Sequence, residues 1–499
     1  MARWRWVVAL LCVTSLAGAA GRTTGDSGAA RDWVREAMDA MGGENALRGV
    51  HGLHMVGVHE LAGVAYSPHL TEPRMTYELV DEWLDVDRSR FSRRATDYVP
   101  SFRDGLQYRL IADPVVRVAI IDAGRFGAFP VDSSGVEAYA RELEQAPERV
   151  LTSAMAASDL EARRDTTIGG QRYHVVAFEH GQISVFIHAI THLPLAVETR
   201  IAVDDPDWTL WGDIVSRTTF SSWSRAREGV HLPLTRTTTR NGIPYEKWSL
   251  TVLDVVASVP ADSLVIPDSL RQQAMHQPPL ALDTGHVIAD GVVYIPSVWN
   301  VLLVRQPDGV VVIESPRSPR YSRLVIAEAA RRFPGVPIKA VIAADFIWSH
   351  YAGIREYIAR GVHVYTPDAN VADLRRILAA PHRLVPDSLA RAPRPAIITG
   401  VASRVTIGTG PNRIELIPAV GPGTDYGEHM LVAYLPDRRL LYASDLLPTP
   451  AFEPNFVGQG TVDVAALVAR ERLSIDSVVT IHLAPRAWAP IADSVQAGY

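Results

Sequence analysis

Histidine and aspartate residues follow three predicted buried strands in the second half of the chain. They are Asp345 and His350 after 339–344, Asp445 after 439–443, and His482 after 478–481. In alternating strand–helix architectures, sites collect at the carboxyl ends of strands, where loops carry groups held by a rigid sheet. Histidine and carboxylate side chains are the residue types that ligate metals and transfer protons. Independent accidents rarely place two histidines and an aspartate at three corresponding strand ends, so His350, Asp445, His482 and Asp345 are candidates for one shared site.

A simpler explanation stands beside this one for each residue. A single histidine or aspartate at a strand end is more often a helix cap or a hydrogen-bond partner than a ligand. A chain without metal, in which His350 and His482 are only hydrogen-bonded, therefore stays open. The histidines near the N-terminus, His51, His54 and His59, straddle a turn-to-strand boundary. We expect these three in solvated or packed positions rather than at a metal.

The elements that must position these residues fall into two kinds. From about residue 280 the chain alternates strands and helices, and Ser318-Pro319 begins a helix that runs to Arg332. Between 52 and 265, period-two apolar runs separated by short turns indicate a large antiparallel sheet. A helix is expected at 32–41, and 134–160 also has helical character. The fold class is therefore α+β, with the best interdomain linker at 260–279.

Length and composition agree with a folded, two-domain chain. The 499 residues exceed a single hydrophobic core, which stops growing at roughly 250–300 residues. With 47% apolar and 21% charged residues, disordered, collagenous and coiled-coil classes are excluded. The formal net charge is −6, and this near balance argues against nucleic acid or an anionic membrane as a partner.

The first twenty residues have the layout of a secretory signal peptide. Arg3 and Arg5 precede an apolar run at 7–16, and small residues follow at 17–20. The run is too short to span a bilayer, and no later segment is apolar for long enough, so we expect no membrane span in the mature chain. The one cysteine, Cys12, lies inside this leader. The mature chain then has no thiol, and any metal must be held by histidines and carboxylates.

The C-terminal half resembles the metallo-β-lactamase fold superfamily over roughly residues 280–489. The resemblance rests on Val341-Ile-Ala-Ala-Asp-Phe-Ile-Trp-Ser-His350-Tyr-Ala-Gly353, on the strand–turn–strand segment 431–445, and on Ile481-His482. It also includes the turn Pro307-Asp-Gly309 and the strand after it. The resemblance implies an αββα sandwich whose first signature is eroded. Asp345, Ile347 and Ser349 stand where the family has two histidines and an aspartate.

This erosion implies a reduced metal site. The first of the family's two metal positions would be lost, and the second would keep His350, His482 and Asp445. These two imidazoles and one carboxylate would hold one Zn, Fe or Mn ion with open positions for water, with Asp345 as a fourth ligand or a general base. A single ion there implies hydrolysis of an ester, amide or lactone. The mid-domain histidine of the family is missing from its turn, and His429 follows a few residues later. His429 could substitute only if the loop before it differs.

The N-terminal half resembles the curved antiparallel sheet of lipoprotein-carrier-like domains. The similar segments are Met41-Gly-Gly-Glu-Asn-Ala-Leu47, Thr191-His-Leu-Pro-Leu195 and Gly229-Val-His-Leu-Pro233. The resemblance implies an apolar ligand on the concave face. Alternatively, the apolar residues of the sheet simply pack against helices or the second domain.

These observations predict an exported two-domain protein, secreted or periplasmic. The expected boundaries are 1–20 for the signal peptide, 30–275 for the antiparallel β domain and 280–499 for the metallo-β-lactamase-like domain. The first hypothesis is a hydrolase that uses one Zn, Fe or Mn ion on an unknown small-molecule substrate. The alternative is an inactive scaffold whose N-terminal domain binds a hydrophobic ligand.

Overall fold

The computed structural model describes most of the chain. The described residues are 26–63, 67, 73–97, 106–124, 127–226, 229–276, 280–420, 427–447 and 458–497. The predicted signal peptide and the loop before His429 lie outside them. We call 26–276 the N-terminal part and 280–497 the C-terminal part.

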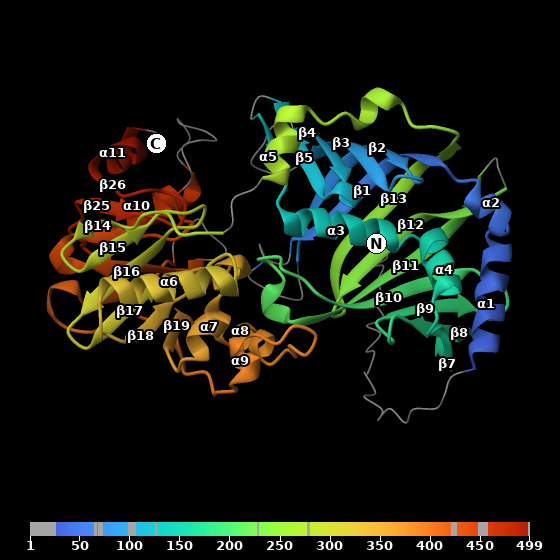
Figure 1. Ribbon diagram of the computed structural model, residues 1–499. Coiled ribbons are helices and arrows are strands. Elements are labelled where there is room, and N and C mark those ends of the chain that lie inside the picture. The colour runs from blue at the N-terminus through green and yellow to red at the C-terminus, as the bar shows by residue number, and fades with distance from the viewer. Residues whose placement is uncertain are drawn as a thin grey trace, which may run out of the picture.

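One large antiparallel sheet dominates the N-terminal part, as the period-two pattern predicts. Its order is β6-β5-β4-β3-β2-β1-β13-β12-β11-β10-β9-β8-β7, and every neighbouring pair is antiparallel. The pairing of β1 with β13 joins the two halves of the sheet at its centre (Figure 1). The strands are β1 (Gly52–Gly63), β2 (Arg74–Asp85), β3 (Arg90–Asp97), β4 (Leu106–Asp113), β5 (Val118–Asp122), β6 (Ala128–Pro130), β7 (Glu161–Ile168), β8 (Gln171–Phe178), β9 (Ile183–His188), β10 (Pro194–Ala202), β11 (Asp213–Arg225), β12 (His231–Arg240) and β13 (Ile243–Val256).

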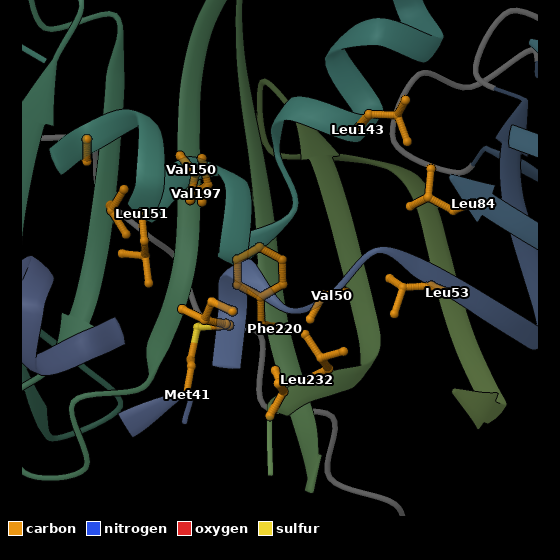
Figure 2. Close-up of a cluster of buried hydrophobic side chains, with 14 of the residues drawn as sticks. Met41, Val50, Leu53, Leu84, Leu143, Val150, Leu151, Val197, Phe220 and Leu232 are labelled. Atoms are coloured by element: carbon orange, nitrogen blue, oxygen red, sulfur yellow. The ribbon is translucent and has the colours of Figure 1, made fainter. Parts of the chain in front are cut away.

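Helices pack against this sheet because their apolar faces need a partner. They are α1 (Ser27–Ala40), α2 (Glu44–Arg48), α3 (Ser133–Glu144), α4 (Pro147–Ala156) and α5 (Asp268–Met275). The first helix is longer than predicted, since Asp26 caps it by accepting from the amides of Gly28 and Ala29. The helical stretch expected at 134–160 is two helices, because Pro147 starts a new one. Figure 2 shows their side chains, such as Leu143 and Leu151, in one core with strand residues such as Phe220.

The segment expected as a linker also contains structure. It forms a short 3-10 helix, η5 (Ala261–Leu264), followed by α5. Ile266 and Leu270 pack against Ile111, Val118 and Ile120 of the sheet. Most of this segment is therefore anchored to the N-terminal part.

Two smaller sheets form the C-terminal part. The first is ordered β14-β15-β16-β17-β18-β19-β20 and the second β21-β22-β23-β24-β25-β26. Pairing is parallel from β17 through β20 and between β24 and β25. The strands are β14 (His286–Ala289), β15 (Val292–Ile295), β16 (Val301–Gln306), β17 (Gly309–Ile313), β18 (Ile338–Ile342), β19 (His363–Pro367), β20 (Ile398–Val401), β21 (Val405–Ile407), β22 (Ile414–Pro418), β23 (Leu431–Leu435), β24 (Leu440–Tyr442), β25 (Ser477–Val479) and β26 (Arg486–Ala487).

The two sheets share a core, and helices cover their other faces. Leu302 and Ile342 of the first sheet lie in one buried cluster with Leu431 and Tyr442 of the second. The helices are α6 (Pro319–Arg332), α7 (Ile354–Ile358), α8 (Val371–Leu378), α9 (Ser388–Arg391), α10 (Gln459–Arg470) and α11 (Ala489–Ala497). The predicted start of α6 is confirmed, because the Ser318 hydroxyl accepts from the Tyr321 amide. Helices α6 to α8 lie beside the first sheet and α10 beside the second (Figure 1).

The two parts are in direct contact. The short helix η4 (Thr209–Trp211) inserts Trp208 and Trp211 into the cluster beneath α6, α7 and α8. Asp213 accepts hydrogen bonds from the amides of Arg383 and Leu384. Gly212 has φ +62° and lies so close to Pro381 that a side chain would clash. In the described part of the chain, no helix combines the length and the apolar character needed to cross a bilayer.

Candidate metal centre

The structure brings His350, Asp445 and His482 together. One potential ligand atom from each lies within 4.8 Å of the others. His350 Nε2 is 3.5 Å from Asp445 Oδ2, and His482 Nε2 is 3.1 Å from Asp445 Oδ1. The two imidazole centroids are 6.5 Å apart and nearly perpendicular. Two imidazoles and one carboxylate thus meet beyond the ends of β18, β24 and β25.

Features of the local structure fix the orientation of these three side chains. His350 is carried by a 3-10 turn, η6 (Trp348–Tyr351), that follows β18. The turn can approach α6 only because Gly353 has no side chain, since a Cβ there would lie 2.0 Å from Ser322 Oγ. Ser444 has a positive φ of 41°, which turns the chain sharply after β24 and places Asp445. The Thr480 hydroxyl accepts from the His482 amide and fixes the third loop.

The ring nitrogens of the two histidines have different surroundings. His482 Nδ1 lies 2.9 Å from the Val298 carbonyl oxygen, which leaves Nε2 facing Asp445. Metal-ligating histidines generally donate their other ring nitrogen in this way. His350 Nδ1 is buried and has no hydrogen-bond partner among the described residues. The nearest carboxylate oxygen on that side, Asp345 Oδ2, is 3.9 Å away, which is too long for a hydrogen bond.

Electrostatics favour the charged forms at this cluster. Burial raises the pKa of Asp445, but the charges of His350 and His482 outweigh it and lower that pKa below its usual value. Burial likewise lowers the pKa of His482, and the hydrogen bond and charge of Asp445 outweigh it and raise that pKa. Protons therefore compete with a cation for the imidazoles at low pH.

Asp345 is fully buried, and both oxygens of its carboxylate accept hydrogen bonds. Oδ1 accepts from the amides of Phe346 at 2.7 Å and Ile347 at 3.1 Å. Oδ2 accepts from the Ser444 hydroxyl at 2.9 Å. Burial, the largest influence, raises the pKa of Asp345 above its usual value. The carboxylate thus ties the loop of His350 to the loop of Asp445.

Glu314 is a site residue that sequence reasoning missed. It ends β17 with φ +75° and no exposure, and its Oε1 lies 3.4 Å from the Ala344 amide and 3.3 Å from the Ser444 hydroxyl. Burial, with the neighbouring charge of Asp345, raises the pKa of Glu314 well above its usual value. The available signal was a lone carboxyl at the end of the apolar run 310–313.

A second missed residue comes from the N-terminal part. Asp207 lies close enough to Ser349, the residue just before His350, for that side chain to influence its carboxylate. Burial, together with the charge of Asp205, raises the pKa of Asp207 to about 7. No local pattern could reveal this contact, because the two residues are far apart in sequence.

His429 lies in a different network. Its Nδ1 is 2.6 Å from Asn370 Oδ1, and the Asn370 amide nitrogen also donates to the Asp345 carbonyl oxygen at 2.9 Å. The group of potential ligands described above does not include His429. The loop on which its substitution as a ligand depended, 421–426, is outside the described residues.

Comparison with solved structures finds similarity to metallo-β-lactamases. The DIM-1 metallo-β-lactamase matches with 15% identity and a TM-score of 0.34, covering 44% of this chain and 99% of that one. A metallo-β-lactamase from Pontibacter korlensis matches with 16% identity and a TM-score of 0.32, covering 43% and 99%. TMB-1 matches with 13% identity and a TM-score of 0.32, covering 44% and 99%. No family model matches the sequence, and no curated protein matches it. At these identities and TM-scores, a site has to be argued from this chain's own residues.

Proposed function

We propose that the chain is a metal-dependent hydrolase of an ester, amide or lactone. In this proposal the C-terminal part is an αββα sandwich of the metallo-β-lactamase type, and a single ion is held by His350, Asp445 and His482. The observation that carries it is the approach of three ligand atoms within 4.8 Å, drawn from three separate strand ends.

The donor set suits the metals expected from the sequence. Imidazole nitrogen and carboxylate oxygen are ligands of Zn, Fe and Mn, and three protein ligands leave positions for water and substrate. Such an ion, when bound, supplies an acidified water and polarises a carbonyl oxygen. The side chains of Asp445 and His482 are 20% and 30% exposed, so this side of the cluster reaches solvent.

The remaining residues act by positioning. The Val298 carbonyl holds His482 by its Nδ1, and Asp345 ties together the loops that carry His350 and Asp445. Asp345 was predicted as a fourth ligand or a general base. With both carboxylate oxygens accepting hydrogen bonds and no exposure, its environment favours the positioning role.

Metal analysis tests this proposal. The purified chain, loaded with zinc, iron or manganese in turn and dialysed, is expected to retain close to one equivalent of one of them. His350→Ala and His482→Ala should each lose it. His363→Ala is the matched control, because His363 is partly buried on β19, where its ring bonds to the Thr399 hydroxyl and stacks on Tyr365. The loaded protein should also hydrolyse simple esters, amides or lactones faster than either site variant.

The same metal analysis distinguishes the hydrolase from the alternative, an inactive scaffold. If no metal is retained from any of the three, the scaffold interpretation stands and the hydrolase is wrong. Export is a further part of the proposal and rests on the leader at 1–20. Amino-terminal sequencing of protein recovered outside the cytoplasm should start near residue 21.

A further inference from the structure

A partly enclosed cavity in the N-terminal part lies between α3 and the middle of the large sheet. Its volume is about 210 Å³, many times what one water needs. Tyr139 and Arg141 line it from α3, and Ile201, Arg240 and Tyr245 line it from strands. A second cavity of about 210 Å³ shares Arg141 and Ile201 with it. The cavities are far in sequence from the candidate metal ligands.

Most charged groups around this cavity neutralise one another. His59 Nδ1 is 3.0 Å from Glu78 and its Nε2 is 3.2 Å from Glu246. Arg93 donates to Glu82 at 2.6 Å and to Glu142 at 2.9 Å. These groups need no further partner, so they form the wall of the cavity rather than a vacant site.

Arg240 differs from these groups, because N–H groups of its guanidinium have no hydrogen-bond acceptor among the described residues. The residue is 5% exposed, yet Nε and Nη1 are buried with no hydrogen-bond partner among the described residues. Its guanidinium lies over the ring of Tyr245 at 3.5 Å and near Trp208 at 5.1 Å, which fixes its orientation. Guanidinium donors left without an acceptor in a buried position are costly.

Arg141 adds a second cation on the helix side. Within the described ranges, no carboxylate lies within ion-pair distance of Arg141 or of Arg240. Burial lowers the pKa of Arg141, and the like charge of Arg240 lowers it further. Two guanidinium groups thus line one cavity, and neither forms an ion pair with a described residue.

We propose that this cavity binds a small organic carboxylate, with Arg240 and Arg141 as its cationic partners. A planar guanidinium matches the two oxygens of a carboxylate. A monoanion fits better than a phosphate dianion, because Glu78, Glu142 and Glu246 also line the cavity. Apolar and aromatic walls, including Leu110, contact the organic part of the ligand.

Benzoate is the probe that fits this description. In isothermal titration of the full chain, benzoate is expected to bind with one-to-one stoichiometry, and its neutral analogue benzamide at least about tenfold more weakly. Arg240→Met should weaken benzoate binding by about tenfold or more. Arg141→Met, on the partly exposed face of α3, gives a second variant in case Arg240→Met does not fold.

Two controls separate this site from others. Arg217→Met removes an arginine from β11 that pairs with Glu198 at 2.6 Å and does not line the cavity, so benzoate binding should not change. Benzoate could also bind a metal at His482. The titration is therefore repeated with His482→Ala, and unchanged binding is expected whether or not the proposed hydrolase is correct.

The proposal is overturned by any of three results. The first is no saturable binding of benzoate at millimolar concentrations. The second is binding that both Arg240→Met and Arg141→Met leave intact. The third is inorganic phosphate binding more tightly than benzoate, which would show that the carboxylate class is wrong.

Discussion

His59 in the N-terminal part and His350 in the C-terminal part are both buried histidines beside carboxylates. His59 has a carboxylate within 3.2 Å of each ring nitrogen. His350 has carboxylates only at 3.5 Å and 3.9 Å, and its Nδ1 has no hydrogen-bond partner among the described residues. The same residue types thus form a satisfied cluster in one sheet and an unsatisfied one at the strand ends of the other part.

The difference teaches that residue type alone does not separate structure from function. A buried ion cluster whose partners are complete stabilises a fold and offers nothing to a ligand. A cluster of imidazoles and a carboxylate that are incompletely paired with one another can accept a further partner, such as a cation. The four predictions below test whether this distinction holds.

The largest expected effect comes from removing the satisfied histidine. His59→Phe should lower the free energy of unfolding by about 3–5 kcal/mol, because Glu78 and Glu246 lose their shared cation. His54→Phe is the matched control, since His54 stacks on Trp83 at 4.0 Å as His59 stacks on Trp248 at 4.1 Å. His54 and its partner Asp81 are more exposed, so the control should cost less than about 1 kcal/mol. Equal losses in chemical denaturation would show that the buried cluster has no special role.

The next effect concerns Asp345, whose carboxylate links the loops that carry His350 and Asp445. Asp345→Asn should weaken metal binding by about 10–100-fold, the usual cost of losing a residue that orients ligands. Competition with a chelating dye measures it. Complete loss of binding would make Asp345 a ligand, and unchanged affinity would remove it from the site. His59→Phe is the control and should leave metal affinity unchanged.

Alkaline pH should weaken the ion pairs of His59 with Glu78 and Glu246. Burial alone lowers the pKa of His59, but the hydrogen bonds that its ring donates to Glu246 and Glu78 outweigh it and raise that pKa to about 9. Folding therefore gains stability that is complete below about pH 6.5 and is lost as pH rises through 9. The neighbouring Arg93 and Tyr108 do not titrate in this window, because the pKa of Tyr108 is raised by burial and by Glu78.

The stability difference between the parent chain and His59→Phe should shrink by about 2 kcal/mol from pH 7 to pH 9. Denaturation series at the two pH values measure it. A constant difference would mean that His59 is not charged in the folded chain. Subtracting the variant removes the contribution of the other groups that titrate.

The smallest effect comes from Asp207, which lies against the loop of the unsatisfied cluster. In the described part of the chain no arginine, lysine or histidine pairs with it, and its pKa is raised to about 7 by burial and by Asp205. A raised carboxyl pKa destabilises the fold as pH rises from about 4 to 7. Asp207→Asn should therefore stabilise the chain at pH 8 by roughly 1 kcal/mol, and hardly at pH 4. Thermal unfolding at both pH values tests this, and a loss of stability at pH 8 would contradict it.

Much of the local structure could be predicted from the sequence. The antiparallel sheet follows from period-two runs, and the start of α6 follows from Ser318-Pro319. Where the prediction differed, a single residue explains it. Pro147 divides one expected helix into two.

The candidate site was predictable only in part. His350, Asp445 and His482 could be found because each follows an apolar run. Glu314 also follows such a run, but no histidine or aspartate stands beside it in the sequence to mark it as part of a site. Asp207 could not be found at all, since its contact with Ser349 crosses between the two parts.

The sequence by itself determined which side chains with ligand chemistry stand at strand ends, because apolar periodicity and turn residues are local properties. Only the tertiary structure decided which of these side chains have hydrogen-bond or ion-pair partners. His59 meets Glu246, and Arg240 meets no carboxylate among the described residues, through strand pairing and helix docking over long sequence separations. Hydrogen bonds reach only about 3 Å, so whether a buried charge is paired depends on the folded arrangement and not on the order of residues.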